Sequence, residues 1–303
     1  MTAGELSERL LDVGGRPVRV LERGSGETAT VLLHGGLQGH SPWIGAADLW
    51  APLMRAADGD GRIVAIDLPG CGGSPLGDRQ ELTIAGIAAR VADTLRALGV
   101  AEAVPVGHAE ASLAALLLAR RQHADLRVPG AVVVAATGAA PTSDGVSPVV
   151  LENPPAPLGS TASVRWALDR LSYSAAHVTD GLVAALAGHA AGDAQRAASE
   201  TAARADVALE LESDLLGEKL ALFAYCRDVG YEVPVTVVWG SHDPLVTVAH
   251  GDGLFELLAT TRAQLDFALL NRVGHFPFSE DPAAMRRLVE PFVARCTAKE
   301  TTR

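Results

Sequence analysis

The sequence has few cysteines, few aromatic residues and no long apolar run. Its three cysteines, Cys71, Cys226 and Cys296, are odd in number and widely spaced, without a Cys-x-x-Cys pair, which indicates a reduced, cytoplasmic chain. Aromatic residues make up 4% of the chain, which argues against an aromatic-lined nucleic-acid surface. No apolar run reaches the roughly 18 residues of a membrane helix, because Arg, His or Gly interrupts each candidate.

Positive charge is also scarce. The formal net charge is −11, which disfavours binding to nucleic-acid phosphates or anionic membranes. The first residues are acidic and lack an apolar segment, so we expect no signal peptide. A small-molecule substrate is therefore the expected partner. The sequence leaves homo-oligomerisation open.

Apolar content is plentiful: 48% of 303 residues is enough for a large core. Short apolar runs alternate with segments of helical periodicity, as in a parallel sheet whose site lies at the carboxyl ends of its strands. The expected strands are residues 17–22, 28–33, 62–66, 103–106, 130–136, 235–238 and 264–270.

One of these strands leads into a pattern typical of a nucleophile elbow. The elbow is a strained strand-to-helix turn, so the residues two positions before and after its centre must be small. Gly107 and Ala111 meet that requirement, and an apolar helix over 111–119 follows. The centre is then Ala109, where a serine is expected. The pattern is that of a hydrolase without its nucleophile.

Three further motifs occur in a consistent order along the chain. The strand at 28–33 ends in His34-Gly35-Gly36, a turn that supplies an oxyanion-hole amide in hydrolases. Asp243 follows a later strand in the pattern Trp-Gly-x-x-Asp, and His275 follows the last strand. The order along the chain, with the nucleophile position first, then the acid and then the histidine, is characteristic of a class of hydrolases.

On these motifs the chain resembles the α/β-hydrolase-fold proteins, with matches dispersed from about residue 17 to residue 295. The resemblance implies an α/β fold with a mostly parallel central sheet flanked by helices. It also implies a helical lid inserted after the sixth strand. We expect a core of residues 1–140 and 229–303 and a lid of residues 141–228.

The resemblance assigns roles to individual residues. His275 is the expected base, Asp243 the acid that orients it, and Ala109 the nucleophile position. The backbone amides of Gly36 or Leu37 and of Glu110 form the expected oxyanion hole, with the Glu110 side chain turned away. No cofactor and no metal ion are expected, because the chain lacks a His-Glu-x-x-His cluster, a dinucleotide glycine fingerprint and a P-loop.

Substrate contacts are expected from the core and from the lid. His108 is expected to have a structural more than a catalytic part, and the lid aromatics form either pocket wall or lid core. The predicted substrate-binding residues are Gly35, His108, Trp166, Tyr173, Phe223 and Phe276.

Within the superfamily, the hydrolases that cleave carbon–carbon bonds of dienol-keto acids are similar in pattern. They typically have Asn before the nucleophile, Trp after the histidine and a lid Arg. This chain has His108 and Phe276 at the first two positions, and no Arg in residues 177–190. An ester, thioester or lactone of mainly apolar character is therefore an equal contender with a carbon–carbon substrate.

Three interpretations of Ala109 remain open. In the first, alanine replaces a native serine and yields an inactive variant. In the second, the chain naturally lacks a nucleophile and uses His275 with Asp243 as a general base for lyase, elimination or cyclisation chemistry. In the third, the protein binds a ligand without catalysis. The first interpretation predicts that the nucleophile alone is altered, which agrees with the pattern.

Overall fold

The computed structural model describes residues 5–121, 123–141, 149–260 and 262–298. Within these residues, eight strands form one sheet in the order β1-β2-β4-β3-β5-β6-β7-β8. The strands are β1 (Ser7–Val13), β2 (Arg16–Arg23), β3 (Thr28–Leu33), β4 (Arg62–Ile66), β5 (Glu102–His108), β6 (Ala131–Val134), β7 (Val235–Gly240) and β8 (Leu265–Leu270). β1 and β2 pair antiparallel with their neighbours, and every other pairing is parallel. The predicted mostly parallel sheet is confirmed.

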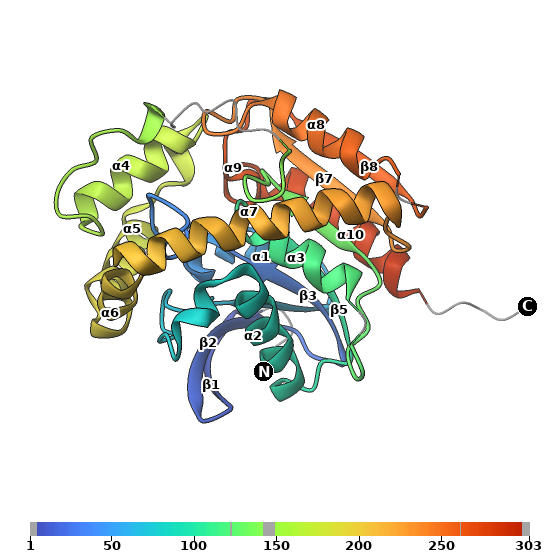
Figure 1. Cartoon of the computed structure of the whole chain (residues 1–303), viewed down its shortest axis with the longest axis horizontal. Helices are drawn as coiled ribbons and strands as arrows, with labels where there is room; N and C mark the ends of the chain where they lie inside the picture. Colours follow the sequence, from blue (N-terminus) through green and yellow to red (C-terminus); the bar gives the residue numbers. More distant parts are fainter. Residues whose placement is uncertain (1–4, 122, 142–148, 261, 299–303) are drawn as a thin grey trace, which may run out of the picture.

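The central strands form the core of the molecule. Residues of β6 and β7 are buried along their whole length, as expected for Val-rich strands covered on both faces. The flanking helices are α1 (Ala51–Ala56), α2 (Ile84–Ala97), α3 (Ala111–Arg120), α8 (Val248–Leu258), α9 (Pro277–Glu280) and α10 (Pro282–Thr297). α1 contacts α10, and α2 contacts α3. In Figure 1, α2 and α3 lie in front of the sheet and α10 lies behind it.

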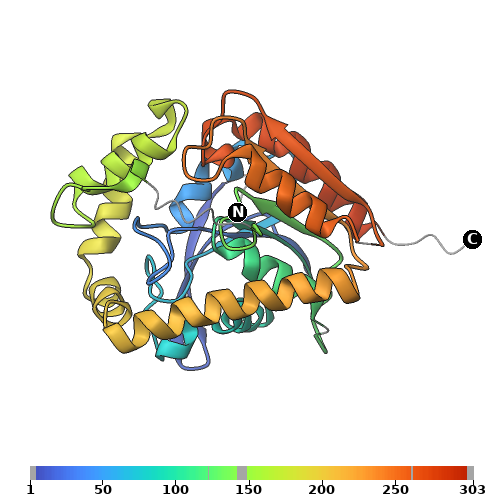
Figure 2. The same cartoon turned by 45° about the horizontal axis from the view of Figure 1, so that its top comes forward.

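The chain between β6 and β7 forms a separate group of helices. They are α4 (Thr161–Leu171), α5 (Asp180–Ala191), α6 (Asp193–Ala202) and α7 (Ala205–Asp228), with 3-10 turns at Val149–Leu151 and Ala175–His177. Side chains of Ser160 and Thr179 cap the first turns of α4 and α5. Figure 2 shows α4, α5 and α6 at one side of the molecule, with the long α7 running from them along the core.

Helix α7 joins the inserted helices to the core. It contacts α6 at one end and α2, α3 and α8 along its length. The chain breaks between α6 and α7 at Ala203 and Arg204, and α7 then continues unbroken to Asp228. Residues 205–228 contain no proline, so helix propensity does not interrupt them.

No helix in the described ranges is both long enough and apolar enough to span a lipid bilayer.

Candidate active site

The turn between β5 and α3 has the geometry of a nucleophile elbow. Ala109 adopts φ +51°, a left-handed conformation that is unusual for a residue with a side chain and costs on the order of 1 kcal/mol. A side chain at Gly107 would place its Cβ 2.6 Å from the Ala111 carbonyl oxygen, so glycine is required there. The Ala109 amide donates to the Val134 carbonyl at 3.0 Å, which anchors the turn to β6. Ala109 is completely buried.

His275 and Asp243 form a buried pair. His275 Nδ1 lies 2.8 Å from Asp243 Oδ2, and both side chains are inaccessible to solvent. Burial lowers the pKa of His275, but the charge and the hydrogen bond of Asp243 outweigh it, so the pKa lies above its ordinary value. His275 Nε2 has no hydrogen-bond partner in the described part of the chain. The ring is therefore oriented on one side and free to exchange a proton on the other.

The backbone of His275 is held by the inserted helices. Its amide donates to the carbonyl of Leu171, the last residue of α4, at 2.8 Å. A Cβ on the preceding Gly274 would lie 2.6 Å from the same carbonyl oxygen, so the two segments are in close contact. The position of His275 thus depends on α4 as well as on the core.

The turn after β3 lies directly against the elbow. A Cβ at Gly35 would lie 2.6 Å from the Cβ of Ala109, and a Cβ at Gly36, where φ is +74°, would lie 2.4 Å from the Gly45 nitrogen. His34 Nε2 accepts a hydrogen bond from the Leu68 amide at 3.1 Å, and Nδ1 lies 2.8 Å from the Gly35 carbonyl oxygen. Gly35 therefore allows the predicted oxyanion loop to approach residue 109, and Gly36 allows the close contact of that loop with Gly45.

His108 links the three segments of the site. Its Nδ1 accepts from the Gly35 amide at 3.3 Å, so Nε2 carries the proton and donates to the His275 carbonyl oxygen at 2.9 Å. Burial holds the pKa of His108 well below its ordinary value. With both nitrogens bonded to backbone, this neutral ring positions the loop and the base and leaves no polar atom for a substrate.

Glu110 is buried beside the elbow. Only 6% of the residue is exposed, and its Oε2 has no hydrogen-bond partner among the described residues. Its charge contributes to raising the pKa of His275 and also acts on His34. The carboxylate is therefore an electrostatic neighbour of the site.

The described residues hold no group of three or more His, Cys, Asp or Glu side chains that could bind a metal ion.

Aromatic side chains pack around His275. Trp43 packs edge-on against His275 and Phe276, with ring centroids 6.1 and 5.4 Å apart, and all three are buried. Phe276 also lies 5.6 Å from the His108 ring. The sequence predicts Phe276 as a site residue. Trp43 was not predicted, although its place in the loop after Gly36 was an available signal.

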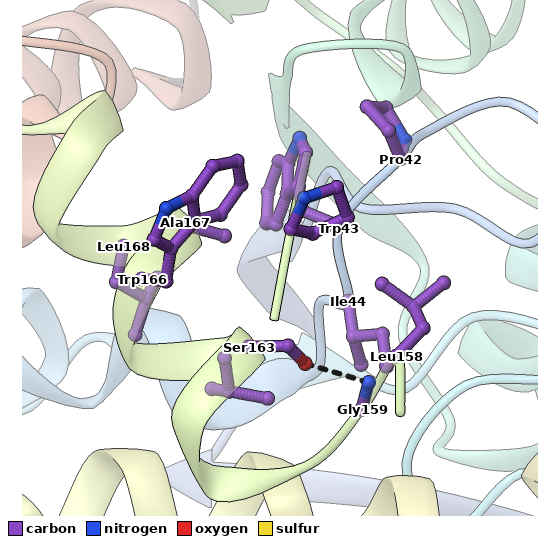
Figure 3. A pocket seen from close by; sticks show the side chains of 11 residues that line it. Pro42, Trp43, Ile44, Leu158, Gly159, Ser163, Trp166, Ala167 and Leu168 are labelled. Atoms are coloured by element: carbon purple, nitrogen blue, oxygen red, sulfur yellow. Dashed lines mark hydrogen bonds between the residues drawn. The ribbon is translucent and has the colours of Figure 1, made fainter. Parts of the chain in front are cut away.

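The three predicted lid aromatics occupy different places. Trp166 and Trp43 line a small, mainly apolar cavity of about 10 Å³ between α4 and the loop after β3 (Figure 3). Phe223 is half-buried in α7 and packs against the core. Tyr173 is 42% exposed, its ring lies 4.6 Å from that of His242, and its hydroxyl accepts from Arg272 Nε at 3.1 Å. Of the three, Trp166 is the one that shares a cavity wall with a neighbour of His275.

The comparisons with known proteins agree with this geometry. The model of a family described as the alpha/beta hydrolase family matches residues 30–288. No curated protein matches the sequence.

Solved structures resemble the chain over nearly its whole length. A crystal structure described as that of a putative lipase from Acinetobacter baumannii AYE is 19% identical, with a TM-score of 0.72 over 97% of this chain and 92% of that one. The meta-cleavage product hydrolase CumD from Pseudomonas fluorescens IP01 is 20% identical, with a TM-score of 0.69 over 95% and 97%. The 2-hydroxy-6-oxo-6-phenylhexa-2,4-dienoate hydrolase BphD from Rhodococcus sp. strain RHA1 is 18% identical, with a TM-score of 0.65 over 95% and 98%. At these identities the likeness shows the fold.

Proposed function

The chain belongs to the alpha/beta hydrolase family, and from that premise we propose that its site binds a mainly apolar small molecule with an activated carbonyl group. In the form with serine at position 109, the site cleaves an ester, thioester, lactone or carbon–carbon bond by Ser-His-Asp catalysis. With Ala109 it binds such a compound without forming an acyl-enzyme.

The conformation of Ala109 carries this proposal. A left-handed φ costs free energy at an alanine, and such strain persists where the surrounding structure enforces it. The glycines at 35 and 107 and the anchoring bond to Val134 enforce it here. The turn thus presents residue 109 as a nucleophile elbow presents its serine.

The chemistry with serine at 109 uses groups already in place. His275 Nε2 takes the hydroxyl proton, the oxygen bonds to the carbonyl carbon, and the amides of Gly36 or Leu37 and of Glu110 stabilise the oxyanion. The leaving group departs with the proton from His275. Water, deprotonated by His275, then releases the acid and restores the hydroxyl.

The Ala109→Ser variant tests the proposal. We expect hydrolysis of a p-nitrophenyl ester to rise by about three orders of magnitude over the unaltered chain, because a nucleophile rejoins an assembled base and oxyanion hole. Ala109→Gly is the matched control, since it changes the same turn without adding an oxygen. Equal rates for all three proteins would reject the proposal.

A second candidate function rests on the free Nε2 of His275. A base that keeps its orienting carboxylate and a raised pKa can abstract a substrate proton without a nucleophile. This account predicts non-hydrolytic turnover by the unaltered chain that His275→Ala abolishes and Ala109→Ser does not improve. Binding with no turnover by either form would instead favour a ligand-binding protein.

We also propose that the helices of residues 141–228 act as a lid on a core of residues 1–140 and 229–303. The bond from the His275 amide to Leu171 supports this division, since it places the end of α4 over the base. A cytoplasmic location is supported by Cys71, Cys226 and Cys296, which are buried free thiols.

A further inference from the structure

A larger cavity lies between the loop after β3 and the inserted helices α5 and α6. Its volume is about 350 Å³. Leu37, Ser41 and Trp43 line it on the loop side, and Gln195 and Ser199 line it on the helix side. Leu37 belongs to the predicted oxyanion loop, and Trp43 packs against His275. The cavity therefore adjoins the candidate active site.

Gln195 has an unpaired hydrogen-bond donor in this wall. The residue is 2% exposed, and its Oε1 accepts from the Gly72 amide at 3.1 Å. That bond fixes which end of the amide is oxygen, so the opposite end is the NH₂ group. Nε2 has no partner in the described chain. Leaving such a donor unpaired costs about 1–3 kcal/mol, which a bound acceptor would recover.

Two further groups in the same wall lack partners. Ser41 Oγ and Trp43 Nε1 are buried and form no hydrogen bond with the described residues. The side-chain oxygen of Gln38, another residue of the wall, already accepts from Ser199 Oγ at 2.8 Å. An indole nitrogen and an amide nitrogen only donate. Together with the Gln195 amide, the residues of the wall thus hold two groups that only donate and one hydroxyl, all three buried and without a partner among the described residues.

The charge of the lining selects between neutral and anionic ligands. Among the described residues that line the cavity, Arg196 alone has a charged side chain, and it is paired with Asp193. Most of the other lining residues are apolar, including Leu37, Ile44 and Leu158. An uncompensated carboxylate would lose its hydration without gaining a counter-charge. A neutral carbonyl oxygen on an apolar body fits these walls better.

We propose that this cavity binds a second, non-reacting carbonyl group of the substrate, with Gln195 Nε2 donating to its oxygen. The substrate class is then an apolar small molecule that bears a ketone, ester or lactone oxygen in addition to the reacting carbonyl. The inference rests on the proposed function for the location of the reacting group. The binding of the carbonyl itself does not depend on residue 109.

The experiment uses the unaltered chain and 2-octanone as a probe, followed by ¹H–¹⁵N NMR. We expect saturable shifts of the Gln195 side-chain amide and of the Trp43 indole N–H, each assigned by substitution. Octanoate should bind at least about tenfold more weakly, because the charged group in the described lining, the Arg196 guanidinium, is already paired with Asp193. No shift of the Gln195 amide with 2-octanone, or tighter binding of octanoate, would overturn the proposal.

Gln195→Glu is the decisive variant, because it keeps an oxygen for the Gly72 amide and removes the donor. At pH 8 we expect the affinity for 2-octanone to fall by roughly tenfold, the scale of one hydrogen bond to a buried neutral donor. Gln264→Glu, an exposed change on the far edge of the sheet, should bind as the unaltered chain does. Equal affinity of Gln195→Glu and the unaltered chain would overturn the proposal.

The two proposals fail separately. If Gln195→Glu does not fold, the shifts in the unaltered chain decide the outcome. A silent Gln195 amide together with an active Ala109→Ser variant would reject this cavity as a carbonyl site and keep the hydrolase site. Shifts of the Gln195 amide with 2-octanone, together with an Ala109→Ser variant that gains no activity, would keep this cavity as a carbonyl site and reject the hydrolase site.

Discussion

At the scale of single residues, the two oxygens of Asp243 have different tasks. Oδ1 accepts from the backbone amides of Leu245 and Val246 at 2.9 and 3.0 Å, which fixes the loop. Oδ2 accepts from His275 Nδ1. An asparagine could keep the first set of bonds with its oxygen, but its NH₂ group would face Nδ1 and favour the tautomer with a protonated Nε2. The loop and the catalytic role can therefore be separated by one substitution.

Asp243→Asn in the Ala109→Ser background should lower ester turnover by about a thousandfold. The expected cause is that His275 no longer acts as a base, while the loop keeps its backbone hydrogen bonds. The thermal unfolding midpoint should therefore change little. Steady-state kinetics with a melting curve on the same samples checks this. Near-unchanged rates would remove Asp243 from the site and point to another carboxylate, such as Glu110.

The residues that could be predicted from the sequence follow strands, whereas those that could not depend on long-range packing. Ala109, Asp243 and His275 each follow a strand, and the carboxyl ends of parallel strands meet at one edge of the sheet, so local pattern and topology predict that they belong to one candidate site. Gln195 and Trp43 lie on an inserted helix and in a loop, whose mutual packing depends on long-range contacts. No spacing in the sequence signals that their donors face one cavity.

At the scale of elements, α5 is tied to the core through His189. His189 Nε2 lies 3.1 Å from Asp48 Oδ2, and Arg19 bridges Asp48 to Asp67. The hydrogen bond to Asp48 raises the pKa of His189 above its ordinary value, although burial opposes it. A raised pKa in the folded state means that protonated His189 stabilises the fold below pH of about 6.5. This stabilisation is lost as the pH rises through the folded-state pKa.

The free energy of unfolding of the unaltered chain should therefore exceed that of His189→Gln by more at pH 6 than at pH 9. Urea titrations of both proteins at the two pH values measure the difference. His242→Gln is the control, because His242 is a histidine away from α5 whose ring packs against Tyr173. A gap between the proteins that is equal at both pH values would show that the pair with Asp48 does not carry the effect.

Elements were predictable to the extent that their residues are buried. Fully buried strands such as β6 and β7 appear as apolar runs in the sequence. β1 was missed because it is an edge strand, largely exposed, whose register is set by its antiparallel pairing with β2. The inserted helices are alanine-rich, so their boundaries carried little signal.

At the scale of the whole molecule, the fold is shared with solved structures that are about a fifth identical to it. The fold survives at that distance, because burial and strand direction constrain it more than side-chain identity does. Only a few side chains are expected to determine the reaction. In the proposed site they are the pair of His275 and Asp243, the unpaired donors of Gln195 and Trp43, and the alanine at the centre of the elbow.

Covalent labelling of residue 109 is the most direct measurement of whether that alanine stands at a nucleophile position. Ala109→Ser is treated with a serine-directed fluorophosphonate, digested and analysed by peptide mass spectrometry, alongside the unaltered chain. We predict a phosphonyl adduct on residue 109 of the variant, lost when His275→Ala is added, and none on Ser112, whose hydroxyl donates to the Gly107 carbonyl oxygen at 2.9 Å. A variant that folds and stays unlabelled at residue 109, or that is labelled equally without His275, would contradict the assignment.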